Sequence, residues 1–355
     1  MTKPSILVLF NQPVLPLDHP DAGSEHDIFD TVKNTVKVLE AAGFDVRELA
    51  ISYDPQPLLD EIKLRRPDAV FNLFEGLATQ TSTEVSVAAF LEWLGVPFTG
   101  SPAACLALGR DKIRTKHLLA AAGLPTPEFK IVDTLPAPQW DGGWPAIVKP
   151  ACQDASVGID QGSVVTTQEQ LEARVRYVID NYGGPVLVER FVFGREFHAN
   201  LIEYGPDQPT RPVTLLPLAE IMFQHTNPDH WPVYTFTAKW NVESDEYRAT
   251  PLVEKVELSD DAMARLRELG AKAFRLLQCR DYARLDVRMT AEGEFFVLEV
   301  NPNPYLNSQA LVSGMEALGR THEHLVVELA LGALARGGRH VPDGVIHVPV
   351  GVSVI

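Results

Sequence analysis

The feature that most constrains the fold is a pair of apolar β patterns, residues 282–287 and 295–304, that carry acidic and amide side chains. Successive side chains of a strand point to opposite faces. Arg284 and Asp286 therefore share one face of the first strand, and the apolar residues beside them form the other. We expect the apolar face to pack in a core and the polar face to line a site.

The second strand shows the same alternation. Val297, Glu299 and Asn301 are predicted to share one face, with Leu298 and Val300 on the opposite face. Each strand thus offers one face to a core and one face to polar chemistry.

The pair Glu292 and Gly293 between the strands predicts a two-residue hairpin turn, which would set Asp286 directly opposite Glu299. Two facing carboxylates repel each other unless a cation joins them. The oxygen donors of Asp286, Glu299 and Asn301 suit Mg²⁺, which also binds water and substrate phosphates. The hairpin therefore indicates a nucleotide-phosphate site, although acidic residues that simply face solvent would give the same pattern.

Length and charge restrict the class of protein. A chain of 355 residues with 45% apolar residues is long enough for two or three domains, each with its own core. The 31 Lys and Arg residues are outnumbered by 47 Asp and Glu residues, which gives a net charge of −16. This charge argues against nucleic acid or an anionic membrane as the main partner.

The sequence shows no targeting or membrane signal. The amino-terminal apolar run at residues 6–10 is too short for a signal peptide, and no segment reaches membrane-spanning length. Cys105, Cys152 and Cys279 are too far apart to suggest a disulfide framework or a zinc motif. A cytoplasmic location is the simplest expectation.

The amino-terminal part alternates strand and helix patterns. Strands are predicted at residues 6–10, 46–51 and 69–73, and helices at 27–42, just before 65–67, and at 83–94. This βαβ order implies an α/β domain with a parallel sheet over residues 1–98. Ligands of such sheets bind at the carboxyl ends of the strands, here Asn11-Gln12 and residues 72–76, where plain solvated turns are the alternative.

Residues 97–102 break the pattern and indicate a linker into a second region, 99–190, and a third region follows at 191–338. The predicted strands are residues 129–132, 146–148, 163–165, 186–188 and 196–202, and the predicted helices are 111–122, 168–181, 260–277 and 322–336. The tail, 339–355, is either a tag-like extension or an edge strand.

The two commonest nucleotide-binding motifs are missing, because the sequence has neither a Walker loop nor a G-x-G-x-x-G after the first strand. A nucleotide site would have to be formed by other residues. Lys149 follows an apolar strand and precedes a loop of small residues, 154–158, whose backbone N–H groups could approach phosphate oxygens. Glu189 ends one strand and Glu196 begins the next, so two carboxylates and an exposed backbone edge could meet adenine and ribose. A surface lysine and an ordinary charged turn are the alternatives.

In chain order these segments resemble the ATP-grasp enzymes and are most similar to the D-alanine–D-alanine ligases. The similar segments are Phe98-Thr-Gly-Ser101, Asp111-Lys112, Gly123-Leu-Pro125, Val148-Lys-Pro150, Ser156-Val-Gly158, the interval from Glu189 to Glu196, Ala238-Lys239, Arg284-Leu-Asp286-Val and Leu298-Glu-Val-Asn301. The resemblance implies an ATP-grasp fold, with an amino-terminal Rossmann-like domain and two α+β lobes that enclose ATP.

The resemblance also implies which residues bind ATP. The corresponding positions are Lys112, Lys149, Ser156, Val157, Gly158, Glu189, Arg190, Val192, Glu196 and Lys239. The three lysines would hold phosphates, Glu189 with the backbone of Arg190 and Val192 would contact adenine, and Glu196 would bind ribose.

The metal positions implied by the resemblance are Asp286, Glu299 and Asn301, for two Mg²⁺ ions, with Mn²⁺ as the alternative ion. The implied catalytic positions are Arg284, Lys239 and Glu25. Arg284 would steady the reacting carboxylate, and Glu25 would receive the ammonium group of the first substrate, although the match around Glu25 needs a gap.

The chain departs from the ligase pattern at the substrate positions. Glu75-Gly76 replaces a His-Gly, Trp240 replaces a tyrosine, Tyr305 follows the metal asparagine in place of a glycine, and Ala310 replaces a serine. Glu75 could pair with a substrate ammonium or could cap the helix that follows it. These changes put D-alanine specificity in question.

The predicted function is an ATP-dependent carboxylate–amine ligase, D-alanine–D-alanine ligase-like, that joins amino acids or small peptides through an acyl phosphate. The alternatives are a ligase of other amino-acid or dipeptide specificity in secondary metabolism and an ATP-binding homologue without turnover. The resemblance favours a homodimer.

Overall fold

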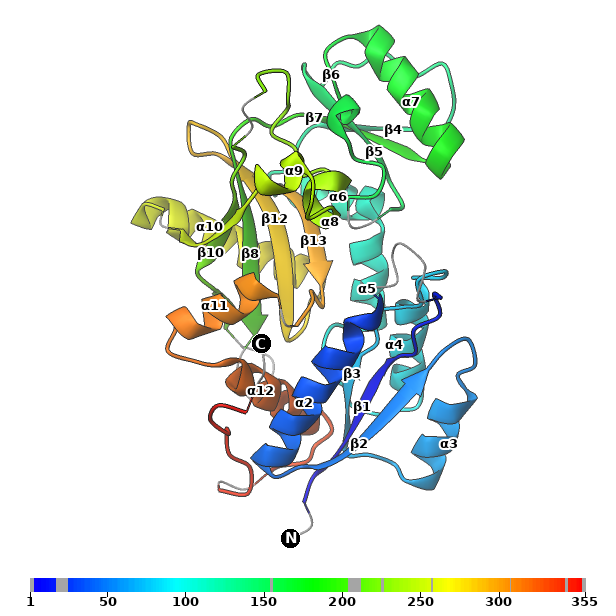
Figure 1. Cartoon of the computed structure of the whole chain (residues 1–355), viewed down its shortest axis with the longest axis vertical. Coiled ribbons are helices and arrows are strands. Elements are labelled where there is room, and N and C mark those ends of the chain that lie inside the picture. The colour runs from blue at the N-terminus through cyan, green and yellow to red at the C-terminus, as the bar shows by residue number, and fades with distance from the viewer. Residues whose placement is uncertain are drawn as a thin grey trace.

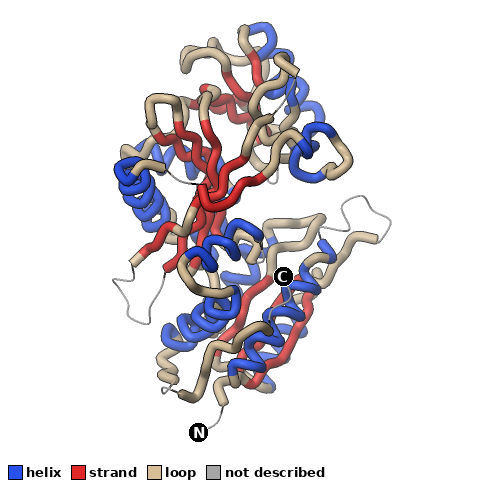
Figure 2. The backbone as a smooth tube through the Cα atoms, turned by 60° about the vertical axis from the view of Figure 1, so that its left-hand side comes forward, coloured by secondary structure: helices blue, strands red, loops and turns tan. Residues whose placement is uncertain are grey.

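A computed structural model describes residues 3–16, 25–153, 156–203, 212–224, 227–256, 258–306, 308–341 and 344–352. Within these ranges the strands form three separate sheets. A large sheet occupies the middle of the molecule, with the amino-terminal sheet on one side and a smaller sheet on the other (Figures 1 and 2). No helix of the described ranges is both long and apolar enough to cross a membrane.

The amino-terminal sheet is parallel, as predicted. Its strands β1 (Ser5–Asn11), β2 (Asp45–Ile51) and β3 (Ala69–Leu73) lie in the order β2-β1-β3. The helices of this unit are α2 (Ile28–Ala42), α3 (Gln56–Leu64) and α4 (Thr83–Trp93). Helix α2 ends at Gly43, whose positive φ of 111° suits the left-handed turn that closes it.

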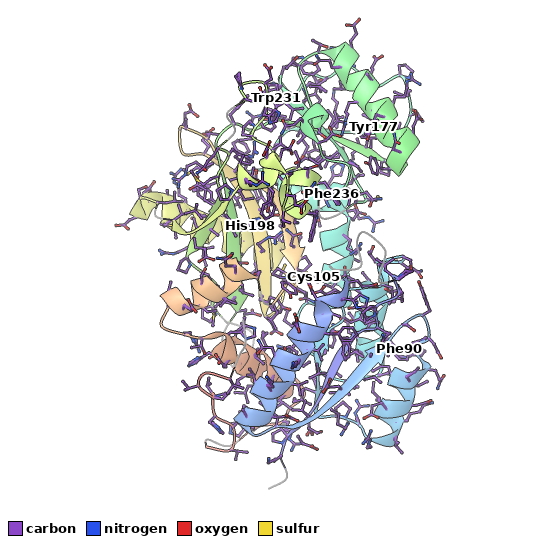
Figure 3. The ribbon with its side chains drawn as sticks, viewed as in Figure 1. Phe90, Cys105, Tyr177, His198, Trp231 and Phe236 are labelled. Carbon is purple, nitrogen blue, oxygen red and sulfur yellow. The ribbon has the colours of Figure 1, made fainter. Side chains whose placement is uncertain are left out.

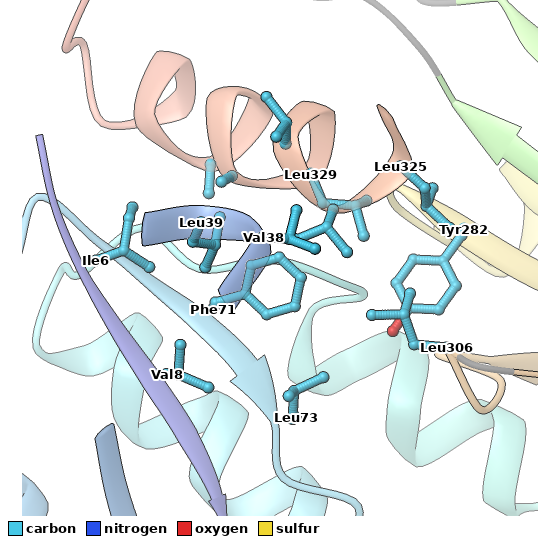
Figure 4. Packing of buried hydrophobic residues seen from close by; sticks show 14 of the residues in the cluster. Ile6, Val8, Val38, Leu39, Phe71, Leu73, Tyr282, Leu306, Leu325 and Leu329 are labelled. Carbon is cyan, nitrogen blue, oxygen red and sulfur yellow. The ribbon is translucent and has the colours of Figure 1, made fainter. Parts of the chain in front are cut away.

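The last helix, α12 (His322–Arg336), packs on the amino-terminal sheet although it lies at the other end of the sequence. One buried cluster joins Phe71 of β3, Val38 of α2 and Leu329 of α12 (Figure 4). The same cluster includes Ile202 and Tyr282, which belong to the large sheet. The amino-terminal unit and the large sheet therefore share a continuous core.

The smaller sheet is antiparallel. Its strands β4 (Phe129–Val132), β5 (Ala146–Pro150), β6 (Val164–Val165) and β7 (Val186–Arg190) lie in the order β4-β7-β5-β6, and η1 (Gln161–Ser163) leads into β6. Helix α7 (Gln168–Tyr182) covers it with Leu171, Val175 and Val178. Two helices, α5 (Ala103–Arg110) and α6 (Lys112–Ala121), connect this region to the amino-terminal unit. Helix α5 was not predicted.

The large sheet has the order β11-β10-β8-β12-β13, and β9 pairs with β8. Its elements are β8 (Arg195–Glu203), β9 (Val213–Leu215), β10 (Leu218–Ile221), β11 (Leu252–Val256), β12 (Tyr282–Met289), β13 (Phe295–Pro302), α8 (Phe236–Trp240), α9 (Asp245–Arg248), α10 (Asp260–Leu276) and α11 (Gln309–Ala317). Helix α10 packs on one face of the sheet, against apolar residues such as Phe197 and Leu285. The opposite face holds the predicted polar residues.

The hairpin of β12 and β13 corrects the predicted turn while confirming the predicted pairing. The backbone pairs Thr290 with Glu294, so the turn holds three residues and not two. A β-bulge then places one extra residue, Leu298, in β13, which restores the pairing of Asp286 with Glu299. The extra turn residue and the extra strand residue therefore compensate for each other, and the register at Asp286 and Glu299 is the predicted one.

The bulge also corrects a predicted face. Val297 was expected beside Glu299, but it lies fully buried in the core with Val287 and Val300. Leu298 instead lines the polar side with Glu299. Between the bulge and the turn, the alternation of core-facing and pocket-facing side chains in β13 is therefore shifted by one residue.

The described part of the tail forms neither a free extension nor a regular edge strand. Ile346, Val348 and Val352 pack against the core of the amino-terminal unit. His347 donates its backbone N–H to the carbonyl of Ala42, at 3.2 Å. Residues 342–343 and 353–355 of the predicted tail lie outside the described residues.

A buried ion pair fixes the start of β12 to the end of α12. Asp281 is 2% exposed and accepts hydrogen bonds from Arg336 at 2.7 and 2.8 Å and from the N–H of Gly100 at 2.8 Å. Arg336 also donates to the carbonyl of Phe98, at 2.7 Å. The ion pair and these hydrogen bonds join residues 98–100 to the start of β12 and to the end of α12.

Replacing Arg336 by Met is expected to lower the free energy of unfolding by about 3–5 kcal/mol, because a buried carboxylate loses its charged partner. Urea unfolding measures the loss. Arg248→Met removes an exposed ion pair to Asp245 and should change the same free energy by less than about 1 kcal/mol. Equal free energies of unfolding for the two variants would show that the buried pair of Asp281 and Arg336 stabilises the protein no more than an exposed pair does.

Candidate active site

One pocket brings most of the predicted residues together. It lies between the smaller sheet and the polar face of the large sheet and is partly open to solvent. Of the predicted residues, the pocket is lined by Lys112, Lys149, Ser156, Val157, Glu189, Arg190, Val192, Glu196, Lys239, Arg284, Asp286, Glu299 and Asn301. Residues from three regions of the sequence thus converge on one cavity.

Five predicted residues do not line this pocket: Gly158, Glu25, Glu75, Trp240 and Tyr305. Gly158 has a positive φ of 75°, and a Cβ atom there would lie 2.7 Å from the Pro150 ring. It therefore allows the loop to pack closely on β5. Residues 154–155 of the predicted phosphate loop lie outside the described residues.

Glu189 forms the buried centre of a charge cluster. It is 1% exposed and pairs with Lys149 at 2.6 Å and with Lys116, which is 2% exposed. Burial alone would raise the pKa of Glu189, but the two ammonium groups outweigh it and hold the pKa at about 2. Glu189 is therefore ionised, and it positions Lys149 at the wall of the pocket.

The expected free backbone edge at Glu189 is absent. Strand β7 pairs with β4 on one side and with β5 on the other, so it is an inner strand. The N–H of Arg190 donates to the carbonyl of Glu128 at 2.9 Å. The segment that follows β7 also reaches the pocket, where Val192 lines it.

Glu196 is held by an arginine on the neighbouring strand. Arg288 donates to Glu196 at 2.8 Å and to the carbonyl of Val192 at 2.6 Å. The Arg288 guanidinium also lies over the ring of Phe191, 4.7 Å from its centre. This contact set fixes the loop between β7 and β8 and orients Glu196 at the pocket.

The polar face of the hairpin has the predicted arrangement. Arg284 donates to both carboxylate oxygens of Asp286, at 2.7 and 3.1 Å, and the Asn301 amide donates to Asp286 at 3.2 Å. Burial would raise the pKa of Asp286, but Arg284 and other cations outweigh it and bring the pKa to about 2. Lys112 pairs with Glu299 at 2.7 Å. Asp286 is thus ionised, and both carboxylates line the cavity.

His198 lies beside the predicted metal position. It is paired with Asp286 in the strand register, and its Nε2 atom lies 3.9 Å from the Asp286 carboxylate. Burial, together with the nearby Arg284 charge, lowers its pKa to about 3, so the ring is neutral at pH 7. Figure 3 labels His198 on the large sheet and Phe236 at the start of α8.

The donor set fits a hard divalent cation. Among the described residues no three His, Cys, Asp or Glu side chains are grouped closely enough to hold a metal ion by themselves. Asp286 and Glu299 nevertheless face the same cavity from paired strands, with the Asn301 amide beside them. Mg²⁺ commonly needs only one or two carboxylates when phosphate oxygens complete its coordination.

The amino-terminal residues predicted to bind substrate have different surroundings. Glu25 is buried and accepts backbone N–H groups of Val14 at 2.9 Å and Leu15 at 2.8 Å, with Ala78 at 3.5 Å. Its carboxylate therefore braces the two loops that follow β1 and β3. Whether it also contacts a substrate stays a prediction.

The other substrate positions are solvent-accessible. Glu75 is exposed, Trp240 is 46% exposed and Tyr305 is 38% exposed. The hydroxyl of Tyr305 accepts a hydrogen bond from Thr31 of α2 at 3.1 Å. The Lys239 ammonium lies 5.4 Å from the centre of the Trp240 ring.

Sequence reasoning missed three residues of the cluster: Lys116, Arg288 and His198. Lys116 is one helical turn after Lys112 on α6, so helical spacing predicts a shared face. Arg288 continues the alternation of Arg284 along β12, and His198 continues that of Glu196 along β8. Helical spacing for Lys116 and strand alternation for Arg288 and His198 could therefore have predicted these positions from the sequence.

Comparison with known proteins supports a family assignment. A family model described as the D-ala D-ala ligase C-terminus matches residues 118–330. A D-alanine–D-alanine ligase of Alcanivorax borkumensis is 34% identical over 275 residues, which cover 77% of this chain and 80% of that protein. An uncharacterized protein of Sinorhizobium fredii, y4sG, is 32% identical over 274 residues, covering 77% and 75%.

Solved structures share the fold. The D-alanine–D-alanine ligase of Bacillus anthracis complexed with ATP has a TM-score of 0.68 at 19% identity, covering 94% of this chain and 98% of that one. The corresponding ligase of Coxiella burnetii has a TM-score of 0.67 at 19% identity and covers 95% of each chain. The family model and the relatives at 32–34% identity show that this chain belongs to the D-alanine–D-alanine ligase family of ATP-grasp enzymes.

Proposed function

We propose that this protein is an ATP-dependent ligase that activates the carboxylate of one amino acid or small peptide as an acyl phosphate and joins it to the amine of another. One observation carries the proposal: Lys112, Lys149, Arg284, Asp286 and Glu299 line the same cavity. Phosphoryl transfer to a carboxylate brings several anions together, and catalysis depends on cations placed around them.

The roles of the residues follow from their charges. Mg²⁺, when bound by Asp286, Glu299 and Asn301, neutralises phosphate charge and polarises the group to be transferred. We propose two such ions, with Mn²⁺ as a substitute. Arg284 then orients the reacting carboxylate and stabilises the oxyanion formed when the amine attacks.

The nucleotide is proposed to lie between the two sheets that form the pocket. Lys112, Lys149 and Lys239 would offset phosphate charge, and Glu196 would accept hydrogen bonds from ribose. Adenine is proposed to contact the segment after β7, near Val192. The apolar pocket residues Ile147, Leu187, Phe191 and Leu298 could supply the surface for a base.

A second candidate is a ligase of the same chemistry for other amino acids or dipeptides. The relatives that carry the name act on D-alanine, but Glu75, Trp240, Tyr305 and Ala310 differ from the pattern expected for that substrate. A hydrogen-bonding site that loses its partner can cost about 1–3 kcal/mol, which is enough to change substrate preference. The two candidates differ only in the substrate pair.

Three further assignments are proposals. We propose the boundaries 1–98, 99–190 and 191–338 for the three units, with 339–355 as a tail, supported by the three separate sheets. We also propose a homodimer and a cytoplasmic location. The net charge of −16 supports small-molecule substrates over nucleic acid.

The function is tested by measuring phosphate release from ATP and Mg²⁺ with D- and L-amino acids, singly and in pairs. We expect release to depend on the amino acids, and the product to be a dipeptide detectable by mass spectrometry. Release with D-alanine alone would support the family activity, whereas release only with other pairs would support the second candidate. Release that no amino acid stimulates would contradict both.

A further inference from the structure

We propose that Lys149 covers the Glu189 carboxylate until a phosphate group draws it away, and that Lys116 is a positioning residue that holds Glu189 in place during this exchange. The uncovered carboxylate then accepts a hydrogen bond from an exocyclic amine of the base. The inference rests on the proposed function, and it adds that recognition of the base depends on recognition of the phosphates.

The first observation is that Glu189 lines the pocket but is covered. Its side chain is only 1% exposed, although it belongs to the wall of the cavity. Each of its oxygens faces one ammonium group: Oε1 faces Lys116, and Oε2 accepts a hydrogen bond from Lys149 at 2.6 Å. A ligand in the pocket therefore reaches this carboxylate only after one of the two lysines has moved.

The contacts of Lys149 allow it to move. Its side chain lines the pocket and is 17% exposed. Within the ranges that the structure describes, Glu189 is the single hydrogen-bond and ion-pair partner of the Lys149 ammonium group. Lys149 can therefore exchange Glu189 for a phosphate oxygen in the same cavity without losing an anionic partner.

The contacts of Lys116, in contrast, hold it in place. It is 2% exposed and lies outside the lining of the pocket. Its ammonium group donates to the Thr126 hydroxyl at 2.8 Å and to the carbonyl of Val297 at 3.3 Å. The Thr126 hydroxyl donates to the same carbonyl at 2.8 Å. Because Val297 belongs to β13, Lys116 joins the hairpin to Glu189 of β7 and stays there when Lys149 leaves.

The charges favour the exchange. Burial, the largest effect, lowers the pKa of Lys116, while the Glu189 carboxylate raises it and the Lys149 ammonium lowers it further. Two ammonium groups thus share one carboxylate and repel each other, and departure of Lys149 removes this repulsion. A buried carboxylate left without any cation would be strongly unfavourable. Lys116 is therefore the residue that allows Lys149 to leave.

The uncovered oxygen selects among bases. An ionised carboxylate accepts hydrogen bonds and donates none. It suits adenine, which carries an exocyclic amine, and disfavours hypoxanthine, which carries a carbonyl oxygen at the same position. Because a phosphate must first remove Lys149, we expect this selection for nucleotides and not for nucleosides.

The test measures dissociation constants by calorimetry at pH 7 and constant Mg²⁺ for adenosine, inosine, ADP and inosine diphosphate. The parent should bind ADP about 10- to 100-fold more tightly than inosine diphosphate, the value of one hydrogen bond to a charged group, and should bind the two nucleosides alike. In Lys149→Met the carboxylate is always uncovered. Adenosine should then bind at least about 10-fold more tightly than it binds to the parent, with no such gain for inosine, whereas ADP should bind more weakly.

The variant Lys116→Met tests the positioning role. Lys149 becomes the one remaining cation beside Glu189, so a phosphate can no longer remove it without leaving the carboxylate unpaired. The preference for ADP over inosine diphosphate should therefore largely disappear. General damage to the pocket would instead weaken both nucleotides equally and keep their ratio, which would contradict the role of Lys116. If Lys116→Met does not fold, the nucleoside measurements on Lys149→Met still decide the exchange.

A control variant and a separate assay distinguish failure of this inference from failure of the proposed function. Lys130→Met removes a lysine of β4 that is paired with the exposed Asp141, and it should leave all four affinities unchanged. A Lys149→Met protein that binds adenosine no more tightly than the parent does would overturn the inference alone, since phosphate release stimulated by amino acids tests the ligase function independently. Absence of ADP binding to the parent would overturn both.

Discussion

Replacing Glu299 by Gln is expected to reduce ATP-dependent phosphate release by at least about 100- to 1000-fold, the range seen when one electrostatic contact to a transition state is removed. The neutral amide keeps the shape of the side chain but loses the charge that a divalent cation needs. Asp286→Asn should have an effect of similar size for the same reason. Steady-state phosphate release at saturating ATP and Mg²⁺ measures both.

The expected loss is in kcat, because most of the proposed base and ribose contacts lie outside the hairpin, on β5, on the segment after β7 and on β8. Binding of a fluorescent ATP analogue should therefore persist in both variants, with weaker dependence on Mg²⁺. Glu294→Gln, an exposed carboxylate just before β13, serves as the matched control and should keep full activity. Full activity of the Glu299 and Asp286 variants would mean that the hairpin binds no catalytic cation.

Replacing Glu189 by Gln is expected to lower the free energy of unfolding by about 3–5 kcal/mol, since Lys116 would keep a buried charge without its partner. Chemical unfolding at pH 7 measures the change. The matched control is Glu128→Gln, which removes an exposed pair to Arg190 and should cost less than about 1 kcal/mol.

The pH dependence of stability supplies a second measurement. The pKa of Glu189 is lowered from 4.5 in the unfolded chain to about 2 in the folded protein. Its contribution is therefore fully present above pH 4.5 and is lost as the pH falls towards 2. The Glu189→Gln variant should lack this part of the acid dependence. Unfolding curves that coincide for parent and variant throughout this range would contradict the assignment.

The sequence predicted the regular parts of the fold well because their signals are local. Strand β3 has the predicted bounds, and the parallel order of β1, β2 and β3 follows from the alternation of strands and helices. The pairing of Asp286 with Glu299 was correct although the turn was not, because the bulge at Leu298 compensates for the third turn residue. A single-residue bulge carries no periodic signal and was missed.

The remaining features depend on contacts between distant segments. Helix α5 is short, and a linker signal at residues 97–102 hid its start. Glu25 accepts backbone N–H groups from the loops after β1 and β3. These contacts require the two loops to be adjacent, and no local sequence pattern shows that they are. The inner position of β7 likewise depends on its pairing with β4 and β5, so the expected free edge could not be tested from the sequence.

The core shared by α12, α2, β3 and the large sheet has a mechanical consequence. Both halves of the chain contribute to one body, so the amino-terminal unit and the large sheet cannot separate without exposing Ile202, Tyr282 and their apolar neighbours to water. The smaller sheet has its own core and borders the pocket proposed to bind the nucleotide. Entry and exit of a nucleotide are therefore expected to involve a hinge beside the smaller sheet, with the rest of the molecule acting as a stationary base.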